Sequence, residues 1–386
     1  MSALAGLSPP APIPFQRVNF GETDEEAMSE ASQRPAAQEF EKVLTAASTM
    51  QASFEEERLS PIQRAQRFLH SYPTVVPFVV LLLGVLLGAA VNYSHFVTAT
   101  NFSTVLTQVT IIGILGIEQT LVILTAGIDL SVGVIMVLSS VVMGRLAVID
   151  GVPIILAFPL GLLTGVACGF LNGLLVTRLK MPPFIVTLGT LSIIGALLIF
   201  YSQSETIRSH DLEEYAPFLQ LMGVPFKIGG ARIILGTFLL IALAIVVWYM
   251  LNRTAYGRHI YATGDDPEAA RLAGINTDNI LLSVYVLAGL ISAIAGWAII
   301  GRVGAISPTA GENANLDSIT AVVIGGTSLF GGRGSVVGTL IGALIVGTFR
   351  NGLALDGLTD LWQDFTIGIL IILAVSIDQW IRKVSA

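Results

Sequence analysis

The sequence predicts an all-α protein that crosses a membrane many times. Of its 386 residues, 53% are hydrophobic and only 12% are charged, and the mean hydropathy is +0.77. Soluble domains carry about a quarter charged residues, so this chain has too few to cover a water-facing surface. Apolar stretches close to the ~20 residues that cross a bilayer recur along it, and runs such as FVVLLLGVLLGAAV do not alternate like a transmembrane β-strand.

The first 71 residues differ in composition from the rest. They are rich in Ala, Pro, Ser, Glu and Gln, and residues 1–70 hold ten acids and six bases. Such a segment lacks the apolar mass for a core, so we expect 1–71 to be a mostly disordered, acidic cytoplasmic tail. A short helix over about 36–58 is compatible with its sequence.

The remaining domain, 72–386, contains apolar runs that predict about ten transmembrane helices with glycine-rich breaks. The eighth and ninth runs flank GGTSLFGGRG, so this pair has a second interpretation as a re-entrant hairpin or as broken helices. The predicted spans are 73–91, 105–127, 131–149, 154–175, 184–201, 232–251, 279–300, 316–331, 334–350 and 363–381.

Basic residues in short loops favour an orientation with both termini in the cytoplasm, because Lys and Arg accumulate on that side of bacterial membrane proteins. Ten bases then face the cytoplasm and five face outward. The first group is Arg64, Arg67, Arg178, Lys180, Arg253, Arg258, Arg271, Arg333, Arg382 and Lys383, and the second is Arg208, Lys227, Arg232, Arg302 and Arg350. The outer loop 202–231 fits equally a surface helix that receives a soluble partner and a passive connector.

A polar island, 251–280, interrupts the apolar chain and forms a cytoplasmic loop over 252–278. Its centre has the signals of a short helix. Asp265 or Asp266 can cap it, Pro267 suits its first turn, and Gly274 ends it. Ala269 and Ala270 would give this helix a slim face that fits a cleft on a partner. An ordinary surface helix is the alternative.

Polar side chains within the second span indicate that this span lines a pathway for a polar substrate. Glu118, Thr125 and Asp129 are spaced by seven and four residues, which places them near one face of a helix. A carboxylate within a membrane faces protein or a water-filled cavity, since its burial costs about 3 kcal/mol. Glu118 therefore either lines a pathway for a hydroxyl-rich substrate or makes a buried hydrogen bond. Asp129 or Ser131 can instead cap the helix that follows a break at Gly127.

Further polar groups occur within other spans: Asn172, Thr187, Thr190, and Asn315 with Asp317 at the outer mouth of the eighth. Asp317 can act as a helix cap or can belong to the pathway. Glycines at 161, 165, 169 and 173 recur every fourth residue. Such a stripe lets a second helix approach closely, and we expect it to serve packing.

Several classes of chemistry have no support in the sequence. Cys168 is the only cysteine, which excludes an internal disulfide and a cysteine metal site, and the four histidines have no metal-ligand spacing. There is no GxxxxGK[ST] to hold nucleotide phosphates and no HExxH. We therefore expect no enzyme activity, no cofactor or metal, and no nucleic-acid partner.

Four stretches resemble the permease subunits of bacterial ATP-binding-cassette importers for monosaccharides, of which the ribose, xylose and fructose systems are the type members. The resemblance covers about 73–386. The stretches are LVILTAGIDLSVG (121–133), NGLLVTRLKMPPFIVTLGT (172–190), GDDPEAARLAGI (264–275) and GENANLDSITAVVIGGTSLFGGRGSVVGTLIGALI (311–345).

This resemblance implies a protein of the bacterial inner membrane that works as a homodimer in lipid. A separate cytoplasmic ATPase subunit would bind ATP, and a periplasmic binding protein would deliver the sugar. The helix at Asp266, Pro267, Glu268, Ala269, Ala270, Arg271 and Gly274 would be the coupling helix that docks on the ATPase. The acidic tail and the carboxylate of Glu118 depart from what we expect of this family, which leaves the identity of the sugar open.

Two rival functions stay open on the sequence alone. A permease of the same class could carry branched-chain amino acids or another small solute. A secondary transporter or channel that works alone is the other rival, and Glu118 is the residue that supports it.

Overall fold

The computed structural model describes residues 74–311 and 313–382. By its contacts the chain divides into two units, and every described element belongs to the second, Ala65–Ala386. The predicted tail 1–71, including the helix considered for 36–58, lies outside the described residues.

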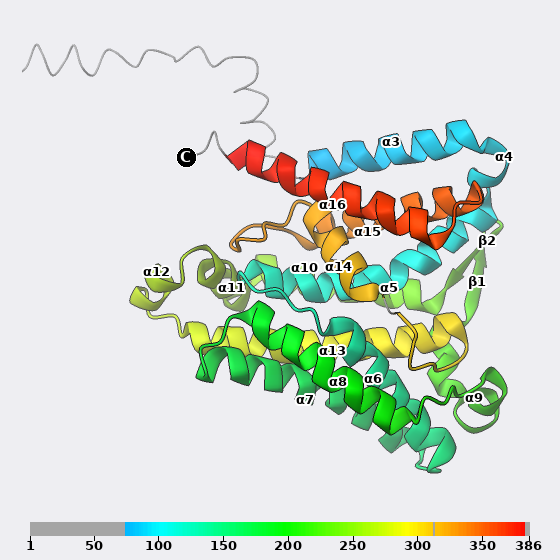
Figure 1. Cartoon of the computed structure of the whole chain (residues 1–386), viewed down its shortest axis with the longest axis horizontal. Coiled ribbons are helices and arrows are strands. Elements are labelled where there is room, and N and C mark those ends of the chain that lie inside the picture. Colours follow the sequence, from blue (N-terminus) through cyan, green and yellow to red (C-terminus); the bar gives the residue numbers. More distant parts are fainter. Residues whose placement is uncertain (1–73, 312, 383–386) are drawn as a thin grey trace, which may run out of the picture. The chain divides into compact units, whose positions relative to one another are not determined.

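Helices make up most of the described chain, and they pack side by side in a bundle (Figure 1). The one sheet among the described residues is a two-stranded antiparallel hairpin of β1 (Pro225–Ile228) and β2 (Ala231–Ile234). The helices are α3 (Val75–Val91), α4 (Tyr93–Phe96), α5 (Ala99–Leu124), α6 (Val132–Gly144) with the π-helical η1 (Arg145–Ile149), α7 (Ile154–Arg178), α8 (Pro183–Ser202), α9 (Ser209–Tyr215), the 3₁₀ helix η2 (Pro217–Gly223), α10 (Leu235–Arg253), α11 (Ala255–Asp265), α12 (Pro267–Leu272), α13 (Thr277–Val303), α14 (Ala314–Ile324), α15 (Val336–Leu355) and α16 (Asp360–Arg382).

Within the described ranges, seven helices are long and apolar enough to cross a membrane: α5, α6 with η1, α7, α8, α10, α13 and α15. Each overlaps one of the predicted spans. α3, with 17 residues, overlaps the first predicted span, and α16 overlaps the last. The prediction of a helical membrane bundle is confirmed.

The predicted span 316–331 is wrong. α14 has 11 residues and ends at Ile324, and no helix forms from there to Val336. Gly326, Gly331 and Gly332 adopt positive φ angles in this stretch, which a helix cannot accommodate. Figure 1 shows α14 inside the bundle, reached from the end of α13 by a segment that turns back among the helices. The chain here is a short helix followed by an irregular segment, in line with the alternative of a re-entrant hairpin or broken helices.

The glycine stripe of α7 packs directly against α13. A Cβ added at Gly165 would overlap the backbone oxygen of Gly289, and one at Gly169 would overlap that of Tyr285. Only a residue without a side chain permits this approach, so the packing role predicted for the stripe is confirmed.

The bundle has two ends that are easily told apart in Figure 1. The α12 end carries α11 and α12, and the hairpin end carries α9, η2 and the β1–β2 hairpin. η2 is not a loose connector, because Leu219 and Met222 are buried. The Phe218 ring stacks on Trp297 of α13 with 5.1 Å between ring centroids. Whether this segment also receives a soluble partner stays a prediction.

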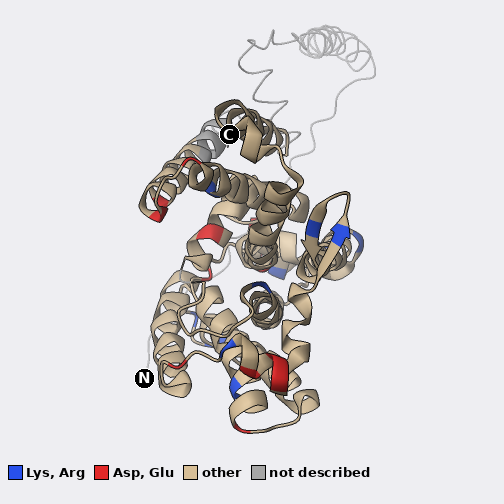
Figure 2. Ribbon diagram, turned by 90° about the vertical axis from the view of Figure 1, so that its right-hand side faces the viewer, with Lys and Arg blue, Asp and Glu red and all other residues tan. Residues whose placement is uncertain are grey.

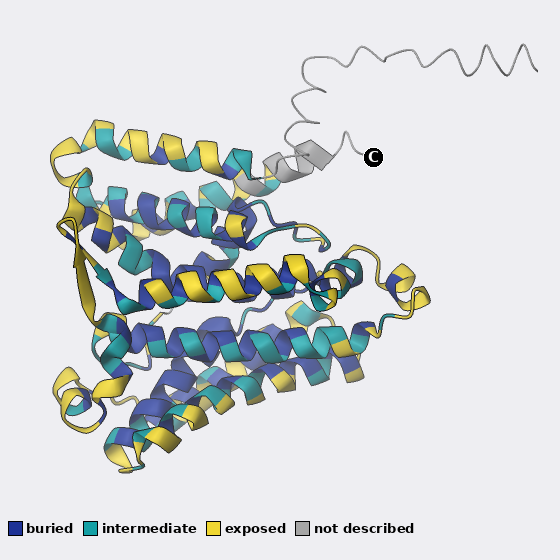
Figure 3. Cartoon of the chain, turned by 180° about the vertical axis from the view of Figure 1, so that it is seen from behind, coloured by how far each residue is buried: buried dark blue, intermediate teal, exposed yellow. Residues whose placement is uncertain are grey.

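The outward faces of several helices are apolar and exposed. Figure 3 shows long exposed faces on α3 and α10, and Phe78, Leu82 and Leu86 line up on α3 at a spacing of four residues. Charged residues are sparse along the helices (Figure 2). An apolar face of this extent is expected of a helix that contacts lipid.

Candidate functional site

The chain between α5 and α6 forms a helix break that enters the bundle. α5 ends at Leu124, three residues before the predicted break at Gly127, and Ala126 has a φ of +60°. The Asp129 carboxylate then accepts hydrogen bonds from the backbone N–H of Ser131 at 2.7 Å and from its hydroxyl at 2.6 Å. In this local turn an acidic side chain accepts a hydrogen bond from the backbone N–H two residues later, and the turn leads to the start of α6.

The N-terminus of α6 is capped by another helix. Asn315 of α14 accepts a hydrogen bond from the backbone N–H of Gly133 at 2.6 Å. Ser131 precedes α6 and makes no side-chain cap, and the Asp129 carboxylate is occupied by Ser131. The predicted cap by Asp129 or Ser131 is therefore wrong, because an amide from 182 positions away along the chain takes that place.

The first turns of two broken helices, α6 and α14, thus meet inside the bundle. Asn172 of α7 donates a hydrogen bond to the Ser131 hydroxyl at 2.9 Å, and the Gln119 side chain donates to the backbone oxygen of Asp129. We call Gln119, Asp129, Ser131, Asn172 and Asn315 the helix-break cluster. Helix N-termini carry partial positive charge, and broken helices that point these ends inward are a recurrent way to build polar sites in transporters.

The other predicted pathway residues lie around this break in different roles. Glu118 is fully buried, and neither of its carboxylate oxygens has a hydrogen-bond partner among the described residues. Thr125 donates to the backbone oxygen of Val122 at 2.8 Å. Thr187 of α8 donates to the backbone oxygen of Ile128 at 3.0 Å, which ties α8 to the break.

The predicted single helical face of Glu118, Thr125 and Asp129 is wrong, because α5 ends at Leu124 and Asp129 lies in the break beyond it. The side chain from α5 that reaches Asp129 is that of Gln119. We did not predict Gln119 as a site residue. Its position beside Glu118 in an apolar span was the available signal.

Asp317 forms an ion pair rather than a helix cap. Its carboxylate lies 2.8 Å from the guanidinium of Arg350 on α15, which in turn lies 2.9 Å from Asp364 on α16. The residue that precedes α14 is Asn313, and it makes no side-chain cap. The cap predicted for Asp317 is therefore wrong. Its ion pair instead fixes the half-length α14 to two neighbouring helices.

The short helix predicted in the polar island is confirmed as α12. The Asp266 carboxylate accepts hydrogen bonds from the backbone N–H groups of Glu268 and Ala269, both at 3.0 Å, and Pro267 occupies the first turn. Gly274 follows the helix with a φ of +87°. Both ends of α12 are thus defined by residues within or next to the helix, as its capping signals indicate.

The side chains of α12 divide into inward and outward groups. Ala270 is buried, and Arg271 binds Thr277 at 2.7 Å and Asp278 at 3.3 Å, so Arg271 holds α12 to the start of α13. Leu272 is 86% exposed, although it is a large apolar residue. We did not predict Leu272 as a contact residue, and nothing in its sequence position sets it apart.

Three backbone segments meet directly behind α12. A Cβ added at Gly264, near the end of α11, would overlap the backbone oxygen of Leu124 at the end of α5. The same oxygen accepts a hydrogen bond at 3.0 Å from the backbone N–H of Gly332. The Tyr261 hydroxyl of α11 donates to the backbone oxygen of Gly334 at 2.9 Å. We call this meeting of α11, α5 and the 325–335 loop the glycine junction.

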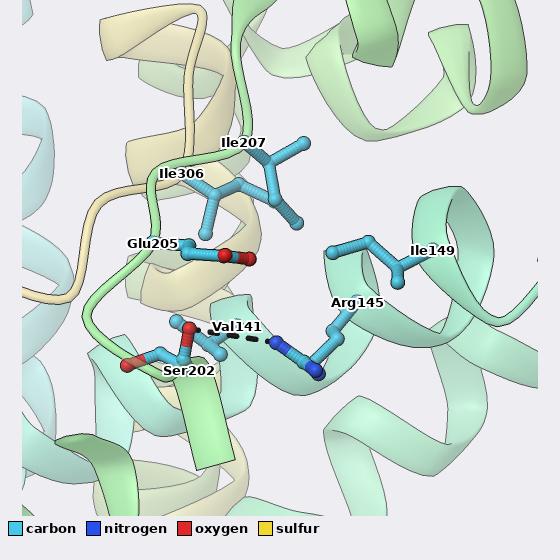
Figure 4. A pocket seen from close by; sticks show the side chains of 7 residues that line it. All are labelled: Val141, Arg145, Ile149, Ser202, Glu205, Ile207 and Ile306. Atoms are coloured by element: carbon cyan, nitrogen blue, oxygen red, sulfur yellow. Dashed lines mark hydrogen bonds between the residues drawn. The ribbon is translucent and has the colours of Figure 1, made fainter. Parts of the chain in front are cut away.

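A small pocket near the hairpin end is a structural joint rather than a site for a solute. Figure 4 shows its seven lining residues, with Arg145 donating a hydrogen bond to the backbone oxygen of Ser202 at 3.4 Å. Its cavity of about 10 Å³ matches the space that one water molecule needs.

Comparison with known proteins decides the family. A family model described as "Branched-chain amino acid transport system / permease component" matches residues 101–375. The chain belongs to this permease family. It is 54% identical over 350 residues to the fructose import permease protein FrcC of Rhizobium meliloti. The aligned residues cover 91% of this chain and 97% of that protein. It is also 39% identical over 330 residues to the ribose import permease protein RbsC of Bacillus subtilis (strain 168), and this alignment covers 86% of this chain and 99% of that protein.

These relatives fit the geometry of the bundle. A permease whose described residues include seven long apolar helices is a multi-pass protein of the bacterial inner membrane. No solved structure matches the chain significantly.

Proposed function

We propose that this permease is the membrane-spanning subunit of an ATP-binding-cassette importer that carries a monosaccharide. The identity of 54% to a fructose import permease, across almost the full length of both proteins, carries this proposal. Relatives named for ribose and allose import support the sugar class over the branched-chain amino acids of the family description. The substrate class is therefore a pentose, a hexose or a related polyol, and D-fructose is the first sugar to test.

An uptake assay tests the substrate class. The permease is reconstituted in vesicles with its ATPase subunit and a periplasmic binding protein, and labelled D-fructose, D-ribose, D-xylose and L-leucine are compared. We expect ATP-dependent uptake of a sugar and none of L-leucine. Uptake of L-leucine alone would establish the rival amino-acid permease, and sugar uptake by the permease without its ATPase would establish a secondary transporter.

The arrangement around the membrane follows from this function. The α12 end lies in the cytoplasm, the hairpin end lies outside, and both termini are cytoplasmic. Arg145 of η1 belongs to the hairpin end, where it adds a sixth base, so the margin of ten bases to five becomes ten to six. α3, α14 and α16 complete about ten membrane segments, of which α14 is half-length.

The division of labour with other subunits is part of the proposal. Residues 72–386 form the permease domain with the coupling loop 252–278, and two copies form the pathway in lipid. ATP is bound and hydrolysed by a separate cytoplasmic subunit, and the permease itself holds no cofactor. A periplasmic sugar-binding protein selects the sugar and docks at the hairpin end.

α12 is the element that contacts the ATPase subunit. Its exposed residues Glu268, Ala269 and Leu272 form the docking face, and Asp266, Pro267 and Gly274 shape the helix. Ala270 and Arg271 transmit its motion, because they are bound to the rest of the chain. A buried apolar anchor at the centre of a contact commonly provides much of its affinity, and Leu272 has the exposure and size for that role.

The glycine junction passes the motion of α12 to the helix breaks. α11 contacts the end of α5 through backbone atoms, without side chains that could rearrange between them. Beyond the end of α5 lies the 125–131 break, which leads directly to Asp129 and Ser131. ATP-driven displacement of α12 and α11 therefore shifts the helix-break cluster and switches the access of the pathway between the two sides.

Replacement of Leu272 with alanine tests the docking face. We expect sugar-stimulated ATPase activity of the reconstituted importer to fall by about tenfold or more, because central anchors cost 2 kcal/mol or more when truncated. Leu361→Ala is the matched control, since Leu361 is 75% exposed but belongs to α16 near its hairpin-end terminus. Equal activity of the two variants in assembled complexes would exclude docking through Leu272.

A further inference from the structure

A cavity of about 660 Å³ lies at the hairpin end, where α5, the turn of the β1–β2 hairpin and the end of α13 come together. Its volume is in the range of small-molecule pockets, roughly 300–1,000 Å³. Figure 2 views the molecule from this end and shows basic residues on the hairpin. The lining consists of Thr100, Ser103, Thr104, Thr107, Gln108, Gly230, Arg232 and Arg302.

One wall of the cavity is a row of hydroxyl groups. The five α5 residues of the lining recur at spacings of three and four, which places them on one helical face. The Thr104 and Thr107 hydroxyls donate to backbone oxygens one turn earlier, at 3.2 and 2.8 Å. Because a hydroxyl has one donor and two acceptor positions, the oxygens remain able to accept hydrogen bonds from a ligand.

The lining residues outside α5 supply donors. Arg232 of β2 and Arg302 of α13 are exposed in the cavity lining, and neither forms an ion pair with a described residue. The backbone N–H of Arg232 donates to the Ser103 hydroxyl at 2.7 Å, which fixes the hairpin against α5. A guanidinium offers up to five N–H donors and accepts none. No carboxylate belongs to the lining.

The deep end of the row leads toward the helix-break cluster. The side-chain oxygen of Gln108 is buried and has no hydrogen-bond partner among the described residues. Gln119 follows eleven residues later, which is close to three helical turns, so the two glutamines share one face of α5 about 16 Å apart. Ile112 and Leu115 are buried on the stretch between them.

We propose that this cavity is the first binding site of the permease for a neutral sugar that enters from the outer side. This assignment rests on the proposed function and adds the residues that hold the sugar. Thr104, Thr107 and Gln108 are the acceptors, and Arg232 and Arg302 are the donors. Sugar hydroxyls donate and accept, so they satisfy both groups of lining residues. An amino acid would place its carboxylate on the guanidinium groups, but its ammonium group would find no carboxylate in the lining to pair with.

Labelling of a single cysteine tests the site. Cys168, the lone cysteine, is replaced by serine, and Thr104→Cys is introduced in the full reconstituted importer. D-Fructose should slow modification by a membrane-impermeant methanethiosulfonate reagent at least about threefold, because a ligand in a pocket covers most of the wall it contacts. L-Leucine should leave the rate unchanged.

Tyr93→Cys in the same background is the control, because Tyr93 of α4 is 72% exposed near the hairpin end and does not line the cavity. Its labelling rate should not respond to D-fructose. Adding Arg302→Gln to the Thr104→Cys protein should raise the D-fructose concentration for half-protection by about tenfold, because a hydrogen bond from a charged donor is stronger than one between neutral groups.

The outcomes separate this site from the proposed function. Uptake of D-fructose without D-fructose protection of the Thr104→Cys protein would overturn the site and leave the function standing. Absence of uptake for every sugar by the unsubstituted importer would overturn both. Protection by L-leucine but not by D-fructose would overturn the assignment of a sugar to the cavity.

Discussion

An importer that carries Gly264→Ala should lose about tenfold or more of its ATP-driven sugar uptake. The added Cβ would overlap the backbone oxygen of Leu124, so α11 and the end of α5 must separate. Overpacking of this kind costs typically 1–3 kcal/mol, and coupling free energies between sites have the same size. Uptake and sugar-stimulated ATPase activity of proteoliposomes measure the effect.

Two further variants show whether the loss arises at the glycine junction. Gly189→Ala is the matched control, because a Cβ at Gly189 of α8 meets no atom within 4 Å, and its uptake should remain normal. Tyr261→Phe removes the hydrogen bond to Gly334 without adding an atom, and we expect a loss of about two- to tenfold. Normal coupling in both Gly264→Ala and Tyr261→Phe would exclude this route.

Features that depend on neighbours along the chain could be predicted from the sequence. α12 is such a feature, because the cap at Asp266, the proline at 267 and the glycine at 274 all act within one or two turns. The long apolar helices and the glycine stripe of α7 are others, since length and a four-residue period are sufficient to indicate them.

Features that depend on distant partners could not be predicted. The early end of α14 is a local exception, because the glycines that follow Ile324 stop the helix although apolar composition made 316–331 resemble a span. The cap on Gly133 comes from Asn315, and sequence spacing alone gives no sign of a partner 182 positions away. The hydroxyl row of α5 was also missed, because Thr100, Ser103 and Thr104 lie before the predicted start of that span at 105, whereas α5 begins at Ala99.

The ion pair between Asp317 and Arg350 has the largest expected effect on stability. Arg350→Gln should lower the free energy of unfolding by about 3–5 kcal/mol, because it leaves the nearly buried Asp317 carboxylate without its partner. α14 is only 11 residues long, so it depends on this contact more than a full-length span would. Thermal unfolding of the purified protein in detergent measures the change.

Asp364 provides the control within the same network. Its side chain is 46% exposed, so Asp364→Asn should cost about 1 kcal/mol or less, as exposed ion pairs do. The double variant Asp317→Asn with Arg350→Gln should recover much of the loss, because neither partner then carries an unpaired charge. If Arg350→Gln cost no more than Asp364→Asn, the pair would not be what holds α14 in place. The position of Asn315 at the cap of α6 would then depend on packing and on its hydrogen bond with Gly133, and both broken helices could shift without breaking an ionic contact.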